Sequence, residues 1–465
     1  MRSAAEIAQL FAAAVGAEHV LAGDAINADY AHDEALTAAP VRPAALLRPE
    51  STAQVAAILC AAHAERVPVT ARGAGTGLSG GCVPRADGVV VSFERMNRVL
   101  EIDRDNFVAH VEPGVQLDQL DAALAPLGLV YPVYPGEYSA SLGGNVATNA
   151  GGMRAVKYGV TRQNVLGVEA VLATGEVIRC GGKLIKTSTG YDLTQLLVGS
   201  EGTLALITQA FLRLHPRLGH AATVLGPFAT LEEVTAAVPR IVASGVGPLM
   251  LEYIDVMTMA AMINSLGLKL GIPDEIRGKA LAYLLVVLEG AREDRLDEDV
   301  QVAGELLAEL GAMDVYVLPP AAGRELVEAR EKAFWIAKSS QADDVIDVVV
   351  PRAAIAAFMQ RVREIAQQHG SLIAGCGHAG DGNVHMAIFQ KDPDVRARVL
   401  RAVFEAGMAL GGAISGEHGL GREKKKYFQA LEDPVKIELM RRIKRAFDPH
   451  GILNPGVIFD DEDGR

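Results

Sequence analysis

A short glycine-rich segment at residues 70–81, with the sequence TARGAGTGLSGG, constrains the fold of this chain more than any other stretch. Glycine tolerates positive φ and lets backbone N–H groups approach a ligand, and several such N–H groups turned the same way form a concave site for a phosphate. A flexible surface loop is the alternative, but a linker needs neither a lone arginine nor flanking apolar runs. The sequence therefore predicts a phosphate-binding loop made of Arg72, Gly73, Ala74, Gly75, Thr76, Gly77, Leu78, Ser79 and Gly80.

Residues 75–80 of this loop also spell G-x-G-x-x-G, the dinucleotide-binding pattern, which requires a strand before it and a helix after it. Residues 67–70 can form the strand. No helix is predicted to follow, because Pro84 and Gly88 come next and residues 89–93 have the composition of another strand. The pattern thus argues against a Rossmann NAD site and for a different diphosphate-bearing cofactor.

A second glycine-dense stretch, residues 135–152, alternates small residues with amide and hydroxyl side chains. We expect that nothing in it contributes to a core. Because it is nevertheless almost uncharged, burial against a polar ligand is favoured over a solvated loop.

Composition argues against several classes of function. The net charge of −13 disfavours nucleic acid as a partner, and four cysteines without a C-x-x-C pair disfavour iron–sulfur and cysteine-based zinc sites. No apolar run approaches the ~20 residues of a membrane span, and Glu6 and Gln9 interrupt any signal-peptide core. We expect a soluble cytoplasmic protein, with docking onto a membrane partner left open.

The sequence pattern changes near Gly219, where the glycine clusters end and longer predicted helices and strands begin. The pattern after Gly219 predicts an α+β domain with an antiparallel sheet and helices on one face. Its predicted helices are 231–243, 294–310, 325–339, 353–369 and 392–410, and its predicted strands are 249–254, 282–289, 314–318, 345–350, 372–376 and 384–389.

Residues 375–385 (GCGHAGDGNVH) predict a β-hairpin with its turn near 379–382. If His378 pairs with Asn383, His385 lies diagonally to His378 on the same sheet face, ~7–8 Å away. Glu417 lies on a tight Gly-flanked loop next to a third histidine, His418. The set of His378, His385 and Glu417 matches a catalytic metal site with open positions, while two histidines bonded to backbone are the alternative.

The chain resembles the flavin-linked 2-hydroxy acid dehydrogenases of the vanillyl-alcohol-oxidase flavoprotein superfamily, such as the flavin-binding subunit of glycolate oxidase, D-lactate dehydrogenase and D-2-hydroxyglutarate dehydrogenase. The motifs that carry the resemblance lie at residues 72–81, 135–152, 199–203, 377–385, 415–424 and 453–456. The resemblance implies a two-domain flavoprotein: a p-cresol methylhydroxylase (PCMH)-type FAD-binding domain at 38–217, an α+β cap domain for substrate and metal at 218–430, and a C-terminal helix and tail at 431–465 that return to the first domain.

By the same resemblance, the glycine loop would hold the FAD pyrophosphate. The adenosine and flavin would contact Pro135, Gly143, Gly144, Thr148, Asn149, Gly151, Ile207 and Asn454. Members with covalent FAD have a histidine in the loop where this chain has Thr76, so non-covalent FAD is expected.

For the cap domain, the resemblance implies a divalent metal, Zn²⁺ or Mn²⁺, on His378, His385 and Glu417. His418 would be the base and Arg330 would bind the substrate carboxylate. The implied reaction is oxidation of a D-2-hydroxy acid to the 2-oxo acid, with hydride transfer to flavin. The hydroxyglutarate branch has an asparagine where this chain has Ala387, and a lysine that residues 343–350 lack, so glycolate, D-lactate or a longer apolar acid is favoured.

Three other functions remain open at this point: a zinc hydrolase, a flavoprotein alcohol oxidase of the same fold, and a non-catalytic subunit with an iron–sulfur partner. The electron acceptor is equally open among a quinone, a cytochrome, an electron-transfer flavoprotein and O₂. A homodimer and peripheral contact with a membrane are both compatible with the sequence.

Overall fold

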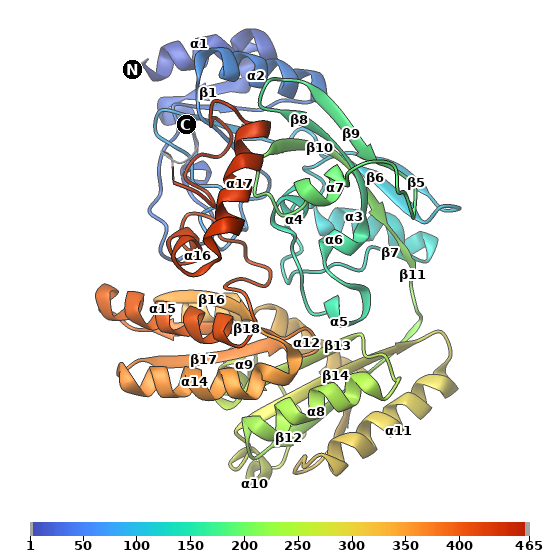
Figure 1. Cartoon of the computed structure of the whole chain (residues 1–465). Coiled ribbons are helices and arrows are strands. Elements are labelled where there is room, and N and C mark those ends of the chain that lie inside the picture. The colour runs from blue at the N-terminus through green and yellow to red at the C-terminus, as the bar shows by residue number, and fades with distance from the viewer. Residues whose placement is uncertain (1–2, 461–465) are drawn as a thin grey trace.

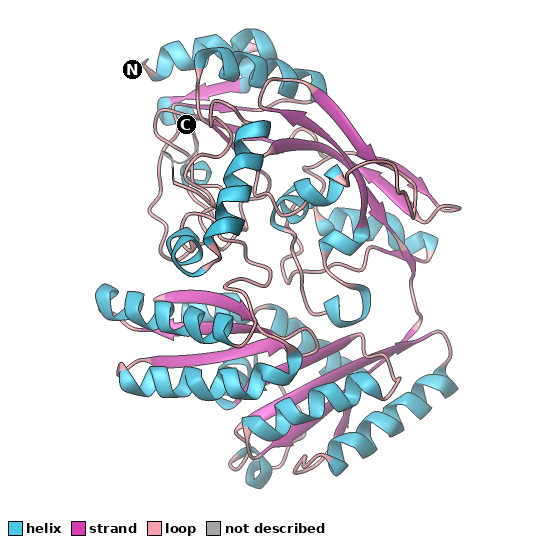
Figure 2. Cartoon of the chain, viewed as in Figure 1, coloured by secondary structure: helices cyan, strands magenta, loops and turns pink. Residues whose placement is uncertain are grey.

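The structure is a computed structural model that describes residues 3–460. Figure 1 shows two halves: the chain up to about residue 217 forms one of them together with the C-terminal helix α17 (Pro434–Phe447), and the intervening residues form the other. Helices and strands are mixed throughout both halves (Figure 2). The predicted α+β class is therefore confirmed.

The first half contains two sheets with a helix between them. A small sheet has the order β1-β2-β4-β3, in which β2 and β3 run parallel to β4, and an antiparallel sheet has the order β5-β6-β10-β8-β9. Helix α2 (Thr52–Glu65) packs Val55, Ile58 and Leu59 into one apolar cluster with residues of both sheets. The strands are β1 (Val20–Ala22), β2 (Ala45–Leu47), β3 (Val69–Arg72), β4 (Val89–Ser92), β5 (Val99–Asp103), β6 (Val108–Val111), β8 (Val165–Leu172), β9 (Val177–Gly181) and β10 (Ala205–Arg213).

Residues ahead of the predicted domain start belong to the same packed unit, because α1 (Ala4–Val15) buries Ile7, Phe11 and Val15 in that cluster. The remaining elements of this half are short. They are α3 (Leu117–Leu124), α4 (Leu142–Thr148), α5 (Ala155–Tyr158), α6 (Thr161–Asn164), α7 (Leu193–Leu197), the pair β7 (Leu129–Val130) and β11 (His215–Pro216), and 3₁₀ turns at Ala17–His19, Gly23–Ala25, Ala28–Ala31 and Ala125–Leu127.

The glycine loop connects β3 directly to β4, its parallel neighbour, and no helix lies between them. The expectation that its G-x-G-x-x-G pattern is not a Rossmann site is therefore confirmed. The second glycine-dense stretch differs from expectation. It forms α4, capped by Ser141, and Leu142 and Val146 are fully buried in the core beside β10. The prediction that this stretch adds nothing to a core was wrong, since two apolar residues four positions apart suffice for one buried helix face.

The second half is built on a seven-stranded antiparallel sheet with the order β15-β12-β14-β13-β17-β18-β16. Its strands are β12 (His220–Phe228), β13 (Met250–Asp255), β14 (Ala282–Gly290), β15 (Tyr316–Leu318), β16 (Asp344–Val349), β17 (Leu372–His378) and β18 (Asn383–Phe389). Its helices are α8 (Leu231–Ala243), α9 (Val256–Leu266), α10 (Asp274–Arg277), α11 (Glu293–Glu309), α12 (Pro320–Glu331), α13 (Ala333–Ser339), α14 (Ile355–Gln368), α15 (Pro393–Ala409) and the 3₁₀ turn Arg352–Ala354.

Helices cover both faces of this sheet, so the expectation of helices on one face was wrong. Helices α8, α11, α14 and α15 pack on one face, whereas α9, α12 and α13 pack on the other (Figure 1). The reason lies in strands that are apolar on both sides: in β13, Leu251 and Tyr253 enter one cluster while Met250 and Ile254 enter the other. Such strands need cover on each face.

The C-terminal segment returns to the glycine loop. After α16 (Lys425–Leu431) and α17, Leu453 bridges to Val69, and the Asn454 side chain donates to the carbonyls of Gly81 and Glu201. Buried Lys444 fixes this turn through Asp448 and the carbonyl of Leu453. Among residues 3–460, no helix combines the length and the apolar character needed to cross a membrane.

Candidate active site

Two adjoining cavities of about 90 and 150 Å³ follow the glycine loop, and they share Gly73, Gly77, Gly144, Thr148 and His418 in their walls. The predicted cofactor residues that line them are Gly73, Ala74, Gly75, Thr76, Gly77, Leu78, Ser79, Pro135, Gly143, Gly144, Thr148, Gly151, Ile207 and Asn454. Segments more than 300 residues apart in the sequence thus meet along one groove.

The remaining three predicted residues support the groove from outside. Arg72 donates to the carbonyl of His32 at 2.5 Å and lies under the loop, where a Cβ on Gly75 would come within 2.1 Å of its guanidinium. Asn149 ends α4 in the left-handed conformation and accepts from the Arg162 N–H. Gly80, with φ of 76°, turns the chain toward Arg422.

The groove has the properties that a diphosphate-bearing cofactor requires. Among the described residues, the backbone N–H groups from Gly75 to Leu78 donate no hydrogen bond, and the buried side-chain nitrogen of Asn145 has no partner. A Cβ on Gly73 would lie 1.9 Å from Ser141 Oγ, so only glycine lets the loop approach α4 this closely. Unpaired donors that line a groove, one of them the buried Asn145 amide, favour an anionic ligand, and the residues present fit FAD.

We predict that FAD is held without a covalent bond. By the resemblance, Thr76 stands where members with covalent FAD have a histidine. Burial also raises the pKa of the Cys82 thiol in the groove to about 12, which keeps this thiol protonated and unreactive. Acid precipitation should therefore release all yellow colour into the supernatant, measured by absorbance. Colour that stays with the pellet would show a covalent link.

The predicted metal ligands lie together on one side of the cap sheet. His378 pairs with Asn383 and His385 with Cys376, as the hairpin register required. Glu417 Oε1 lies 3.2 Å from Nε2 of both His378 and His385, and the ligand atoms of the three residues all lie within 4.8 Å of one another. Two imidazoles and one carboxylate at these separations fit a divalent cation.

Glu252, which the sequence analysis missed, supports this cluster from β13. It is fully buried, and its Oε1 lies 2.8 Å from His378 Nδ1. Burial disfavours the His378 imidazolium, but Glu252 and Glu417 outweigh it and raise the pKa to about 10. A carboxylate that accepts the Nδ1 proton leaves Nε2 free for a metal, the usual outer-shell arrangement of metal-bound histidine. A glutamate in the otherwise apolar segment 249–254 was the available indication.

A second missed carboxylate, Asp347 on β16, shapes the loop that carries Glu417 and His418. Its Oδ2 accepts from the N–H groups of Gly416 and Glu417 at 2.6 and 2.7 Å, and Oδ1 accepts from Lys424 at 2.7 Å. Asp347 is fully buried; burial raises its pKa, but the Lys424 ammonium bound to its Oδ1 opposes this, and the carboxyl stays ionised with a pKa below its usual range. The ionised carboxylate thereby fixes the backbone of this loop, and with it the directions in which the Glu417 and His418 side chains point.

His418 lies beside the cluster, with its ring centroid 5.0 Å from that of His385 and Nδ1 3.4 Å from Asp347 Oδ1. Burial lowers the His418 pKa to about 3, although Asp347 opposes this. The imidazole is therefore neutral at physiological pH and able to accept a proton.

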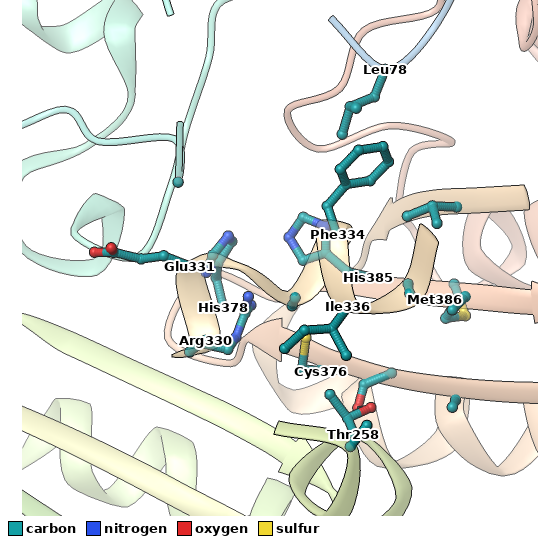
Figure 3. Close-up of a pocket in the computed structure, with 18 of the residues that line it drawn as sticks. Leu78, Thr258, Arg330, Glu331, Phe334, Ile336, Cys376, His378, His385 and Met386 are labelled. Carbon is teal, nitrogen blue, oxygen red and sulfur yellow. The ribbon is translucent and has the colours of Figure 1, made fainter. Parts of the chain in front are cut away.

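Arg330, at the end of α12, is buried at 5% exposure, with Nη2 2.8 Å from Glu252 Oε2. Its Nε and Nη2 nevertheless satisfy no hydrogen-bond geometry. Arg330, His378, His385, Glu417 and His418 all line one cavity of about 250 Å³ between the two halves. In Figure 3, Arg330 lies next to His378, and Phe334 points toward Leu78 of the glycine loop.

Comparisons with known proteins agree with this architecture. Residues 43–181 match the model of an FAD binding domain, and residues 218–458 match that of FAD linked oxidases, C-terminal domain. An uncharacterized FAD-linked oxidoreductase of Mycobacterium tuberculosis (strain ATCC 25618 / H37Rv) is 59% identical over 98% of this chain and 99% of its own length. A D-lactate dehydrogenase of Anaerostipes hadrus is 38% identical over 96% and 95%.

The fold is also that of a solved structure, p-cresol methylhydroxylase with substrate bound. The two chains superpose with a TM-score of 0.81 over 99% of this chain and 97% of that one, at 17% identity. The predicted PCMH-type two-domain fold is therefore confirmed.

Proposed function

This chain belongs to the family of FAD-linked oxidases, and on that premise we propose that it oxidises a D-2-hydroxy acid to the corresponding 2-oxo acid. Membership establishes an FAD-linked oxidoreductase. The substrate class is the proposal, and one observation carries it: the cavity beside the flavin groove unites a buried arginine, a neutral histidine and a metal-type His/His/Glu cluster.

Each side chain has a separate task in this proposal. Arg330 binds the substrate carboxylate, which its Nε, without a partner in the protein, favours. His418 accepts the hydroxyl proton. When bound, FAD supplies the hydride acceptor, and a divalent metal held by His378, His385 and Glu417 supplies polarisation of the hydroxyl. We propose Zn²⁺ or Mn²⁺, since a set of two nitrogens and one carboxylate suits either.

The site affects the three alternative functions from the sequence analysis in different ways. A hydrolase has no use for the FAD groove. An alcohol oxidase of the same fold would not need Arg330, whose guanidinium pairs with Glu252 on one side but keeps a buried Nε without a hydrogen-bond partner, which costs free energy unless a ligand accepts from it. A subunit role with an iron–sulfur partner is compatible with the same chemistry and concerns only the electron acceptor.

The test is anaerobic reduction of the bound flavin, followed by absorbance, across D- and L-2-hydroxy acids. We expect bleaching by D-enantiomers and at least about tenfold slower bleaching by L-enantiomers, as one misplaced group at a preorganised centre gives. Bleaching by simple alcohols but by no 2-hydroxy acid would contradict the proposal and favour the alcohol oxidase.

A further inference from the structure

The cavity of about 250 Å³ that Arg330 and the His/His/Glu cluster line, called the substrate cavity below, has two chemically different ends. Its charged and imidazole side chains are Arg330, Glu331, Glu417, His378, His385 and His418. Going along the strands away from His385, the next row on the same sheet face is Val345, Ala387 and Ala374, which pair side by side. Beyond them lies Phe389.

Helices α9 and α13 cover this apolar row. Met257 and Ala261 line it from α9, and Phe334 and Ala337 line it from α13. Among the lining residues on α9, only Thr258 has a hydroxyl, and it already donates to the carbonyl of Gly375 at 3.2 Å. Among the described lining residues, this end therefore offers no charge and only Ser340 as a further hydroxyl.

The register also gives the depth of the apolar end. Ala387 lies two residues beyond His385 and Phe389 four residues beyond it. At ~3.3 Å per residue these positions are ~7 and ~13 Å from the cluster along the strand. A group attached to a carbon held at the cluster therefore passes over Ala387 and Ala374, where small side chains leave space.

From this arrangement we infer that the physiological substrate carries a branched aliphatic or aromatic side chain that fills the space over Ala387 and Ala374. The inference rests on the proposed function and narrows it to apolar 2-hydroxy acids larger than D-lactate. Glycolate leaves the space empty. A dicarboxylic 2-hydroxy acid would place its second carboxylate where none of the described lining residues is a cation.

The first test compares kcat/KM for anaerobic flavin reduction by D-2-hydroxyisocaproate, D-phenyllactate, D-lactate, glycolate and D-2-hydroxyglutarate. Either of the first two should exceed D-lactate by at least about tenfold, since each methylene in an apolar pocket is worth about that or more. D-2-hydroxyglutarate should be the poorest of the chiral acids.

The second test fills the pocket. Ala387→Phe should lower the ratio of kcat/KM for D-2-hydroxyisocaproate to kcat/KM for D-lactate at least about tenfold. Ala308→Phe, on the exposed side of α11, is the matched control and should leave this ratio unchanged. Flavin content, measured in all three proteins, shows whether each variant is folded.

The outcomes separate the two levels of the proposal. If D-lactate or glycolate is preferred and Ala387→Phe is silent, the apolar-substrate inference is wrong while the 2-hydroxy acid reaction stands. If no 2-hydroxy acid reduces the flavin, the proposed function itself fails and the inference falls with it.

Discussion

His385→Ala should yield a protein that retains its FAD, contains no bound metal and turns over at least about 10³-fold more slowly. His385 supplies one of only two imidazoles in the cluster, and Glu417 would lose one of its two histidine neighbours. Lewis-acid polarisation is worth several kcal/mol, and each 1.36 kcal/mol corresponds to a factor of ten in rate. Elemental analysis measures the metal, and flavin absorbance measures the FAD.

The FAD should be unaffected because His385, unlike Glu417, does not line its groove. The glycine loop and α4 form the groove, whereas His385 lies on β18 and does not line it. His220→Ala, at the exposed start of β12, is the matched control and should retain both metal and rate. Wild-type metal content in His385→Ala would refute the assignment of this cluster as a metal site.

The parts of the site that the sequence predicted are local. The hairpin of His378 and His385 follows from alternation and turn glycines over 11 residues, and register alone then brings the two imidazoles to one face. The glycine loop was equally predictable, because Pro84 and Gly88 indicate that no helix follows Gly80.

Glu252 and Asp347 could not be assigned roles in this way, because their partners are distant. Glu252 meets His378 across 126 residues of sequence, and Asp347 meets the 416–418 loop across about 70. No periodicity encodes such pairings. Each residue was visible only as a single charge in an apolar strand, and buried carboxylates of this kind are either paired or functional.

The errors in the predicted fold also come from contacts between segments that are distant in the sequence. A prediction that assigns each strand one buried face leaves α9 unplaced and puts all helices on one side of the sheet. In the structure, strands such as β13 are apolar on both faces, and the helices on the second face complete the substrate cavity through Met257 and Phe334. The side of the sheet that the prediction left uncovered is thus the side that holds the site.

His418→Gln should lower the rate of flavin reduction by about 10²–10⁴-fold while metal and FAD contents stay at wild-type levels. The expected separation from His385→Ala follows from the geometry. His418 lines both the substrate cavity and the flavin groove, but it is not one of the three clustered ligands. Glutamine keeps the approximate size and polarity of the side chain but cannot accept a proton at the hydroxyl.

The pH dependence gives this prediction a second, independent readout. Burial lowers the His418 pKa to about 3, so the neutral, proton-accepting form predominates at every pH above about 4, and positive charge at the neighbouring cluster would shift the pKa further in the same direction. The ratio of wild-type to His418→Gln rates should therefore be constant between about pH 5 and 9, and any acid limb in that range must come from another group and persist in the variant. His220→Gln is the control for the substitution itself. A variant that reduces its flavin at the wild-type rate would exclude His418 as the base, and a rate ratio that falls as the pH is lowered through 6.5 would show instead that His418 titrates as an ordinary, solvated histidine.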